Sequence, residues 1–161
     1  MLELPIRSVI EPRKLVVAAP HMSVGQAARL MKKGKVGAVL IVDEGLLVGI
    51  FTERDALFRV LARGLDPEST VLRDVMTRDP TTVAPDETFG YALLLMHENG
   101  FRHAPVVEDG RPIGVVSARH ALDPDLEEFT AEAERRKHIR RRAQVASRAS
   151  SGRLTRSAPG R

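Results

Sequence analysis

One short segment of the sequence combines polar side chains and a chain geometry suited to binding a phosphorylated sugar. It reads Gly49-Ile50-Phe51-Thr52-Glu53-Arg54-Asp55, an apolar strand running into a helix with Thr52 at its N-cap. The first N–H groups of such a helix have no partner within the helix, and its dipole favours phosphate there. The Thr52 hydroxyl can donate to a phosphate or ribose oxygen, and Asp55 can accept hydrogen bonds from two vicinal hydroxyls. The alternative is that Thr52 and Asp55 form a capping box that only stabilises the helix.

The same segment occurs a second time with one change. Gly114-Val115-Val116-Ser117-Ala118-Arg119-His120 lies 65 residues later, with Ser117 in place of Thr52 and His120 in place of Asp55. A neutral histidine accepts a single hydrogen bond and cannot hold two hydroxyls as a carboxylate does. If the first segment binds a ribose at Asp55, we therefore expect one competent site there and a second site that is weak, different or empty.

These two segments belong to a longer internal repeat. With an offset of 65, residues 19–57 align without gaps on residues 84–122, and the matches fall on glycines and apolar positions. Upstream, residues 6–10 resemble residues 72–76 after a shift of one residue. The chain is therefore a duplication.

Each copy has the pattern strand–helix–strand–strand–helix, which predicts an α/β fold with pseudo-two-fold symmetry. In the second copy the paired strands are expected at 104–107 and 113–116. In the first copy we expect a strand at 16–17, a helix with Ser23 as its N-cap that ends at Gly34, strands at 39–42 and 47–51 joined by a turn at 43–45, and a helix from Thr52 to about Ala62.

The unit resembles the CBS domain, named for cystathionine β-synthase. The resemblance rests on the glycine, two apolar residues, Thr52 and Asp55 of the first segment, and on 71–77, which resembles the lead-in of such units. It implies two tandem CBS units at 6–64 and 71–122, forming a Bateman module. In the remaining segment, 123–161, acidic residues precede basic ones as suits a helix dipole, so we expect a charged helix and tail there. It further implies a regulatory module that binds AMP, ATP, NAD-type molecules or S-adenosylmethionine in clefts between the units and pairs into homodimers.

The resemblance also suggests further ligand contacts. Arg102 and His103 stand where the family often places phosphate-binding residues, although Arg102 could be a solvated loop residue and His103 a satisfied strand end. The aligned residues 36–38 are small and apolar, which suits packing of adenine against the backbone. Arg119 could reach a phosphate or face solvent. The candidate ligand-binding residues are Thr52, Asp55, Val36, Gly37, Ala38, Arg102, His103, Ser117, Arg119 and His120.

The net charge of +4 is confined to the C-terminal segment. Lys and Arg total 25 and Asp and Glu total 21, but residues 1–122 hold 15 of each sign. Residues 135–142 form a basic cluster that could bind nucleic acid, an acidic protein or anionic lipid, or be only a solvated helix end. No aromatic residue except Phe129 follows residue 122, which disfavours base stacking. From residue 149 the composition predicts a disordered tail.

Several classes of protein are excluded or disfavoured. The absence of Cys excludes disulfides, iron–sulfur clusters and Cys-ligated zinc. His21, His97 and His138 lack metal-ligand spacing, and no catalytic triad, Walker loop or Rossmann fingerprint occurs. The longest apolar run, 38–42, is too short for a membrane helix, and no signal peptide is evident, so we expect a cytoplasmic protein.

We therefore expect a non-enzymatic regulatory module without a metal or a required cofactor, which senses an adenosine-type ligand and signals to a separate protein. The alternatives are a structural dimerisation module without ligand, or a nucleic-acid binder that uses the tail.

Overall fold

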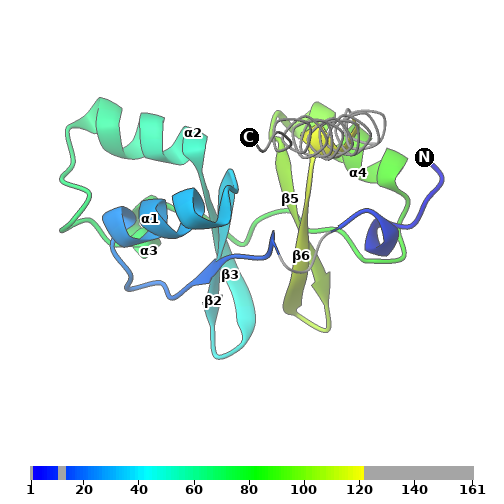
Figure 1. The fold of residues 1–161 in the computed structure, drawn as a ribbon, viewed down its shortest axis with the longest axis horizontal. Coiled ribbons are helices and arrows are strands. Elements are labelled where there is room, and N and C mark those ends of the chain that lie inside the picture. The colour runs from blue at the N-terminus through cyan, green and yellow to red at the C-terminus, as the bar shows by residue number, and fades with distance from the viewer. Residues whose placement is uncertain (1, 11–13, 122–161) are drawn as a thin grey trace, which may run out of the picture. The chain divides into compact units, whose positions relative to one another are not determined.

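The computed structural model describes residues 2–10 and 14–121, which form two similar α/β repeats (Figure 1). None of the helices in this part of the chain is long and apolar enough to cross a membrane. The first repeat contains β1 (Val17–Ala18), α1 (Val24–Gly34), β2 (Ala38–Asp43), β3 (Leu46–Thr52) and a helical segment made of α2 (Glu53–Asp55), a π-helix (Ala56–Val60) and a 3-10 turn (Leu61–Arg63). The second contains α3 (Leu72–Val75), β4 (Thr77–Arg78), α4 (Phe89–Asn99), β5 (His103–Glu108), β6 (Arg111–Ser117) and a 3-10 turn (Ala118–Ala121).

The strands pair largely as the repeat pattern predicts. The first sheet has the order β1-β2-β3-β4, with β1 parallel to β2 and the other pairs antiparallel. In the second repeat β5 and β6 form an antiparallel pair, but the expected first strand is reduced to one parallel bridge between Val83 and Val106. The prediction of strand–helix–strand–strand–helix is therefore confirmed in the first repeat and only in part in the second.

Three local details differ from the sequence prediction. The first strand begins at Val17 rather than Val16. Helix α1 ends at Gly34 as predicted, but the left-handed capping residue is Lys35, with φ of 53°. The helix after Thr52 is not an α-helix throughout, because the Leu61 N–H bonds to the carbonyls of Ala56 and Leu57, which widens the turn.

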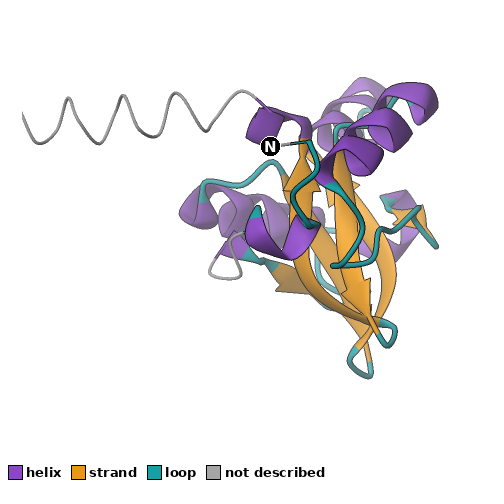
Figure 2. Ribbon diagram, turned by 90° about the vertical axis from the view of Figure 1, so that its right-hand side faces the viewer, coloured by secondary structure: helices purple, strands orange, loops and turns teal. Residues whose placement is uncertain are grey.

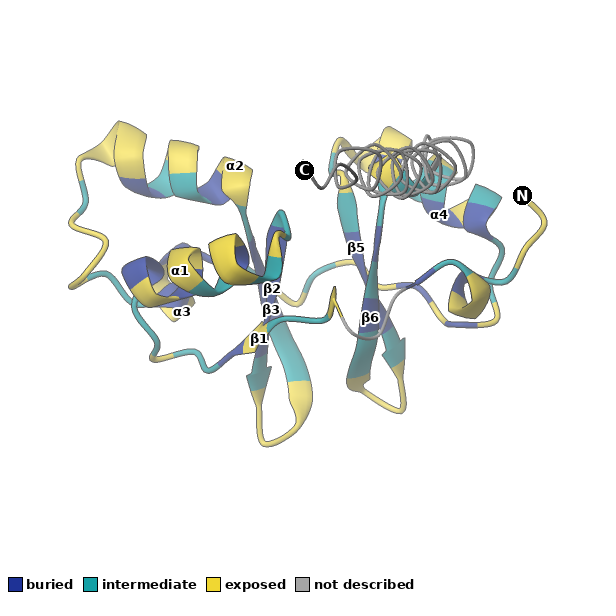
Figure 3. Ribbon diagram, in the orientation of Figure 1, coloured by how far each residue is buried: buried dark blue, intermediate teal, exposed yellow. Residues whose placement is uncertain are grey.

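The most consequential feature is that the short segment leading into each repeat packs in the core of the other repeat. Leu72, Val75 and Met76 are buried in the first core together with residues of α1 and of the sheet. Ile6 and Ile10 are buried in the second core with Phe89 of α4. Figure 3 colours the buried positions along the ribbon dark blue. The sequence similarity of 6–10 and 72–76 thus reflects equivalent packing positions, but on exchanged partners.

One glycine in each repeat makes this exchange possible. A Cβ on Gly49 of β3 would collide with the Met76 side chain, and a Cβ on Gly114 of β6 would lie 2.7 Å from Cδ1 of Ile10. The glycine repeated in the two signature segments therefore accommodates the last residue of the crossing lead-in.

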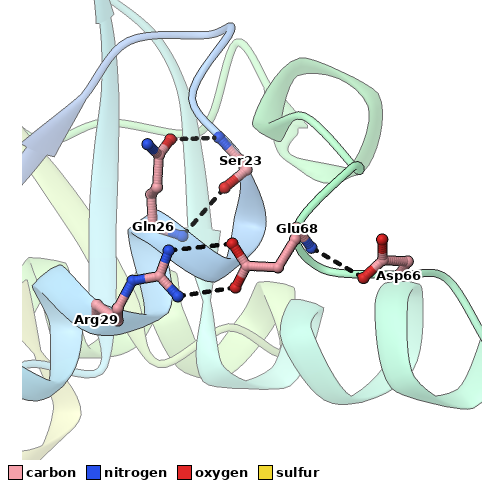
Figure 4. Close-up of polar contacts among 5 residues, drawn as sticks. All are labelled: Ser23, Gln26, Arg29, Asp66 and Glu68. Carbon is pink, nitrogen blue, oxygen red and sulfur yellow. Dashed lines mark hydrogen bonds and ion pairs between the residues drawn. The ribbon is translucent and has the colours of Figure 1, made fainter.

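The N-terminus of α1 holds the segment that connects the repeats (Figure 4). Ser23 and Gln26 form a capping box, as the N-cap prediction for Ser23 implied. The Arg29 guanidinium donates two hydrogen bonds to the Glu68 carboxylate, at 2.8 and 3.1 Å, and Asp66 accepts from the Glu68 N–H at 3.1 Å. These contacts bind the connection to the first repeat before it enters α3.

The two repeats meet through their hairpins, whose strands run side by side (Figure 2). Ala38, Leu40 and Ile50 are buried there, with Val115 of the second repeat packed against them. At the hairpin tips the Leu47 N–H donates to the Gly110 carbonyl at 3.0 Å. The ends of β3 and β6 away from these tips carry the Thr52 and Ser117 segments.

We predict that Leu72→Ala lowers the free energy of unfolding of the first repeat by about 2–5 kcal/mol. Leu72 lies in the lead-in of the second repeat, yet its side chain is fully buried in the core of the first. Urea denaturation measures the change. Leu46→Ala, at a hairpin residue 49% exposed, is the control and should change stability much less. A Leu72→Ala variant as stable as the control would contradict the exchange of lead-in segments.

Candidate functional site

Asp55 is a buried charged residue in the helix that follows β3, and its carboxylate caps the start of that helix. Its Oδ2 accepts hydrogen bonds from the N–H and the hydroxyl of Thr52, both at 2.9 Å. In return the Asp55 N–H donates to the Thr52 hydroxyl oxygen at 3.3 Å. The capping box that the sequence allowed is therefore present. The hydroxyl proton of Thr52, a candidate donor to a ligand, is directed at Asp55 instead.

The other carboxylate oxygen of Asp55 faces an arginine that the sequence analysis did not single out. Arg59 Nε lies 3.3 Å from Asp55 Oδ1, one turn further along the helix. Arg59 Nη1 donates to the carbonyl of Val75 at 3.1 Å. The arginine thus connects Asp55 to the end of the crossing helix α3.

Asp55 lies at a cleft of about 480 Å³ formed by both repeats. Arg102 and His103 enter it from the start of β5, so the structure brings these two candidates together with Thr52 and Asp55. The connecting segment supplies Thr77, Pro80 and Thr81, which the sequence analysis missed. The remaining lining residues are Ile50, Glu53, Arg54, Leu57, Phe58 and Phe101.

The pKa of His103 is influenced by charged residues of both signature segments. Partial burial lowers the pKa of His103 below its ordinary value of 6.5, and the positive charges of Arg119 and Arg102 lower it further, against the opposing effect of Glu53. A Cβ on Gly37 would lie 3.0 Å from Nε2 of His103, so a larger residue at 37 would press on the imidazole.

The second signature segment keeps the cap but changes its chemistry. The Ser117 N–H donates to Nδ1 of His120 at 3.2 Å. This bond corresponds to the one from the Thr52 N–H to Asp55 Oδ2 in the first segment. Because Nδ1 accepts this hydrogen bond, it carries no proton. A neutral imidazole has one acceptor nitrogen, and in His120 that acceptor is already in use. The two segments thus share the same cap, but the second has no carboxylate to offer a ligand.

The other candidates lie on this second side. Val36, Gly37 and Arg119 line a cavity of about 500 Å³ with Lys32, Lys35 and Glu53. Ala38 is buried in the contact between the hairpins. Val36, Gly37 and Ala38 therefore do not line the cleft at Asp55, whereas Thr52, Arg102 and His103 do.

Backbone pairing explains why residues 37 and 102 occupy equivalent places. The Glu53 N–H donates to the Gly37 carbonyl at 3.1 Å, and the Ala118 N–H donates to the Arg102 carbonyl at 3.0 Å. Arg54 donates to the Gly100 carbonyl at 2.9 Å and so binds the end of α4.

Two further expectations concern the C-terminal segment and metal binding. The basic cluster at 135–142 and the predicted disordered tail lie outside the described residues. Within residues 2–10 and 14–121, no group of three or more His, Asp or Glu side chains is arranged to hold a metal ion.

The duplicated fold with a cleft shared by both copies defines a tandem α/β repeat module. A family model for the CBS domain matches residues 6–62 and 72–125. The chain therefore belongs to the CBS domain family and carries two copies of the domain, a pair known as a regulatory ligand-binding module. This confirms the resemblance inferred from the signature segments.

Individual relatives agree with this assignment. The CBS domain-containing protein CBSCBSPB2 of Arabidopsis thaliana is 43% identical over 101 residues, which cover 62% of this chain and 19% of that protein. The chain thus spans about a fifth of that relative's length. An uncharacterized conserved protein from Pyrococcus horikoshii has a similar crystal structure, with a TM-score of 0.71, 29% identity, and coverage of 78% of this chain and 94% of that one.

A third comparison includes ligands. The CBS domain pair of protein MJ0100, solved in complex with 5′-methylthioadenosine and S-adenosyl-L-methionine, matches with a TM-score of 0.66 and 27% identity. The match covers 73% of this chain and 96% of that one.

We predict that stability falls as the pH drops below about 6.5, the ordinary pKa of histidine, because the unfolded chain then binds a proton at residue 103 that the folded chain excludes. The slope from one residue is at most about 1.4 kcal/mol per pH unit. Urea titrations between pH 5 and 8 measure it. The variant His103→Asn should reduce the slope. Identical pH profiles for the His103 variant and the wild type would refute the assignment.

Proposed function

We propose that this chain is a regulatory module that binds an adenosine-containing ligand of the AMP, ATP, NAD or S-adenosylmethionine class in the cleft at Asp55. The observation that carries the proposal is the composition of this cleft. It joins a nearly buried carboxylate from the first repeat to Arg102 and His103 of the second. The complex of the MJ0100 domain pair supports the choice of ligand class.

Each part of such a ligand has chemically suitable neighbours. Asp55 Oδ1 can accept from a ribose hydroxyl, and the exposed Arg102 can pair with a phosphate or carboxylate. Apolar side chains that suit a purine ring line the same cleft, among them Ile50, Phe58 and Phe101.

The second signature segment should bind such a ligand poorly. His120 offers one acceptor, and the Ser117 N–H occupies it. We therefore infer one ribose site per chain. If neither signature segment binds an adenosine compound, the chain would be a structural module without ligand, the alternative that His120 in place of an aspartate also suggests.

The ligand would act by changing how the two repeats fit together. A molecule held by Asp55 on one repeat and Arg102 on the other stabilises arrangements in which both lie within reach. The free energy available for regulation equals the difference in ligand binding free energy between two arrangements of the repeats. The proposal assigns no catalytic step to the chain, and a separate partner protein would receive the signal.

We also propose that the chain forms a homodimer, as is common for paired CBS domains. Large apolar side chains are exposed on two helical segments, Leu57, Phe58 and Leu61 after Asp55 and Tyr91 and Leu94 on α4. Light scattering coupled to size-exclusion chromatography should give twice the mass of 17.7 kDa. Substituting Phe58, which is 59% exposed, by Glu should shift the mass towards the monomer. A monomeric wild type at micromolar concentration would rule the dimer out.

Isothermal titration calorimetry with AMP, ATP and S-adenosylmethionine tests the ligand proposal directly. We expect at least one of them to bind with one site per chain. Asp55→Asn should weaken that binding by about 10-fold or more, because a hydrogen bond to a charged acceptor contributes about 1.5–3 kcal/mol. Asn retains one oxygen that can accept from the Thr52 N–H, so the cap is largely kept.

The matched control is Asp43→Asn, which makes the same chemical change at an exposed hairpin residue at the opposite end of β2. It should bind as the wild type does. Binding unaffected by Asp55→Asn, or two equivalent tight sites per chain, would contradict the proposal.

A further inference from the structure

We propose that Arg59 competes with the ligand's ribose for Asp55 Oδ1 and so sets both the affinity of the cleft and its preference for ligands with a 2′,3′-diol. This inference rests on the proposed function. It concerns a side chain outside the signature segment, and it follows from the geometry around the Asp55 carboxylate.

The acceptor capacity of Asp55 is largely in use. A carboxylate offers about four acceptor positions on its two oxygens. Oδ2 accepts two hydrogen bonds from Thr52, and Oδ1 has Arg59 Nε at 3.3 Å. A ribose diol that donates two hydrogen bonds to this carboxylate must therefore use Oδ1, and it must move the Arg59 guanidinium aside to use it fully.

The two groups around Asp55 differ in how easily they are displaced. The Thr52 contacts close a three-residue capping box, at 2.9 Å, within the backbone geometry of the helix start. The Arg59 side chain is 43% exposed and its contact is longer, so it is the weaker of the two. Displacement of Arg59 leaves the cap intact, which makes Oδ1 the exchangeable side of the carboxylate.

Arg59 also has a second anchor that keeps it close. Its Nη1 donates to the Val75 carbonyl at 3.1 Å, at the end of α3 and two residues before Thr77 in the wall of the cleft. The guanidinium can therefore leave Oδ1 by turning about this bond. Occupation of the cleft would then alter a contact on α3, the segment on which the first core depends.

The arginine is not required for the cap itself. In the second repeat the Ser117 N–H bonds to His120, and the position aligned with Arg59 is Pro124, which carries no charge. Arg59 also belongs to the π-helix at Ala56–Val60 that begins directly after Asp55, and π segments are frequent at functional sites. Both observations favour a role of Arg59 in the chemistry of this cleft rather than in a shared structural need.

The test compares two nucleotides on the full chain by calorimetry. AMP carries the 2′,3′-diol, and 2′,3′-dideoxy-AMP lacks it. Removing the competing cation with Arg59→Gln should tighten AMP binding by up to about fivefold, the equivalent of a partly exposed ion pair of about 1 kcal/mol. Binding of 2′,3′-dideoxy-AMP, which does not need Oδ1, should stay within twofold of the wild type.

Two controls separate this role from a structural one. Arg63→Gln removes an exposed cation of the same helical segment and should leave the binding of both nucleotides unchanged. In an Asp55→Asn background, Arg59→Gln should no longer tighten AMP binding, as expected for two residues that act on one contact.

The outcomes distinguish this inference from the proposed function. If AMP binds the wild type and depends on Asp55 but Arg59→Gln leaves it unchanged or weaker, the competition is refuted and the proposed function stands. An equal change for both nucleotides also refutes it, because the diol would then play no part. If neither the wild type nor Arg59→Gln binds AMP, both the ribose site and the competition are overturned.

Discussion

The structure depends on the exchange of two short apolar segments between the repeats. Leu72, Val75 and Met76 complete the first core, and Ile6 and Ile10 complete the second. Burying a leucine or isoleucine side chain contributes roughly 1.5–3 kcal/mol, so neither core is complete without residues from the other half of the sequence. The exchange joins the repeats more firmly than the hairpin contact alone would. It also places the segment after α3, with Thr77 and Thr81, in the wall of the cleft.

The site illustrates how one set of polar groups can serve stability and recognition together. Asp55 caps a helix with Oδ2, while Oδ1 pairs with Arg59 and is the oxygen proposed to bind the ligand. His120 performs only the first of these tasks, because an imidazole has one acceptor to offer. The two halves of the duplication therefore keep the same fold while they differ in what they can bind.

The fold could be read from the sequence to a large extent, and the site only in part. Repeated glycines and apolar positions identified the duplication, the paired strands and the Ser23 cap, because these features depend on local pattern. The exchange of lead-in segments could not be predicted, since nothing local distinguishes packing on one repeat from packing on its copy. Arg59 was missed for a related reason. Its partner Val75 is 16 residues away, and a lone arginine on a helix usually faces solvent. Arg54 shows the same difficulty, because its bond to Gly100 spans 46 residues.

The hydrogen bond between the hairpin tips has a mechanical consequence. Leu47 and Gly110 hold the tips together, while the opposite ends of β3 and β6 carry the residues of the two signature segments. A seven-residue strand is roughly 20 Å long, and Ala38, which pairs with Thr52 at the end away from the tips, is also buried in the contact between the hairpins. The two hairpins are therefore braced at both ends rather than hinged at the tips.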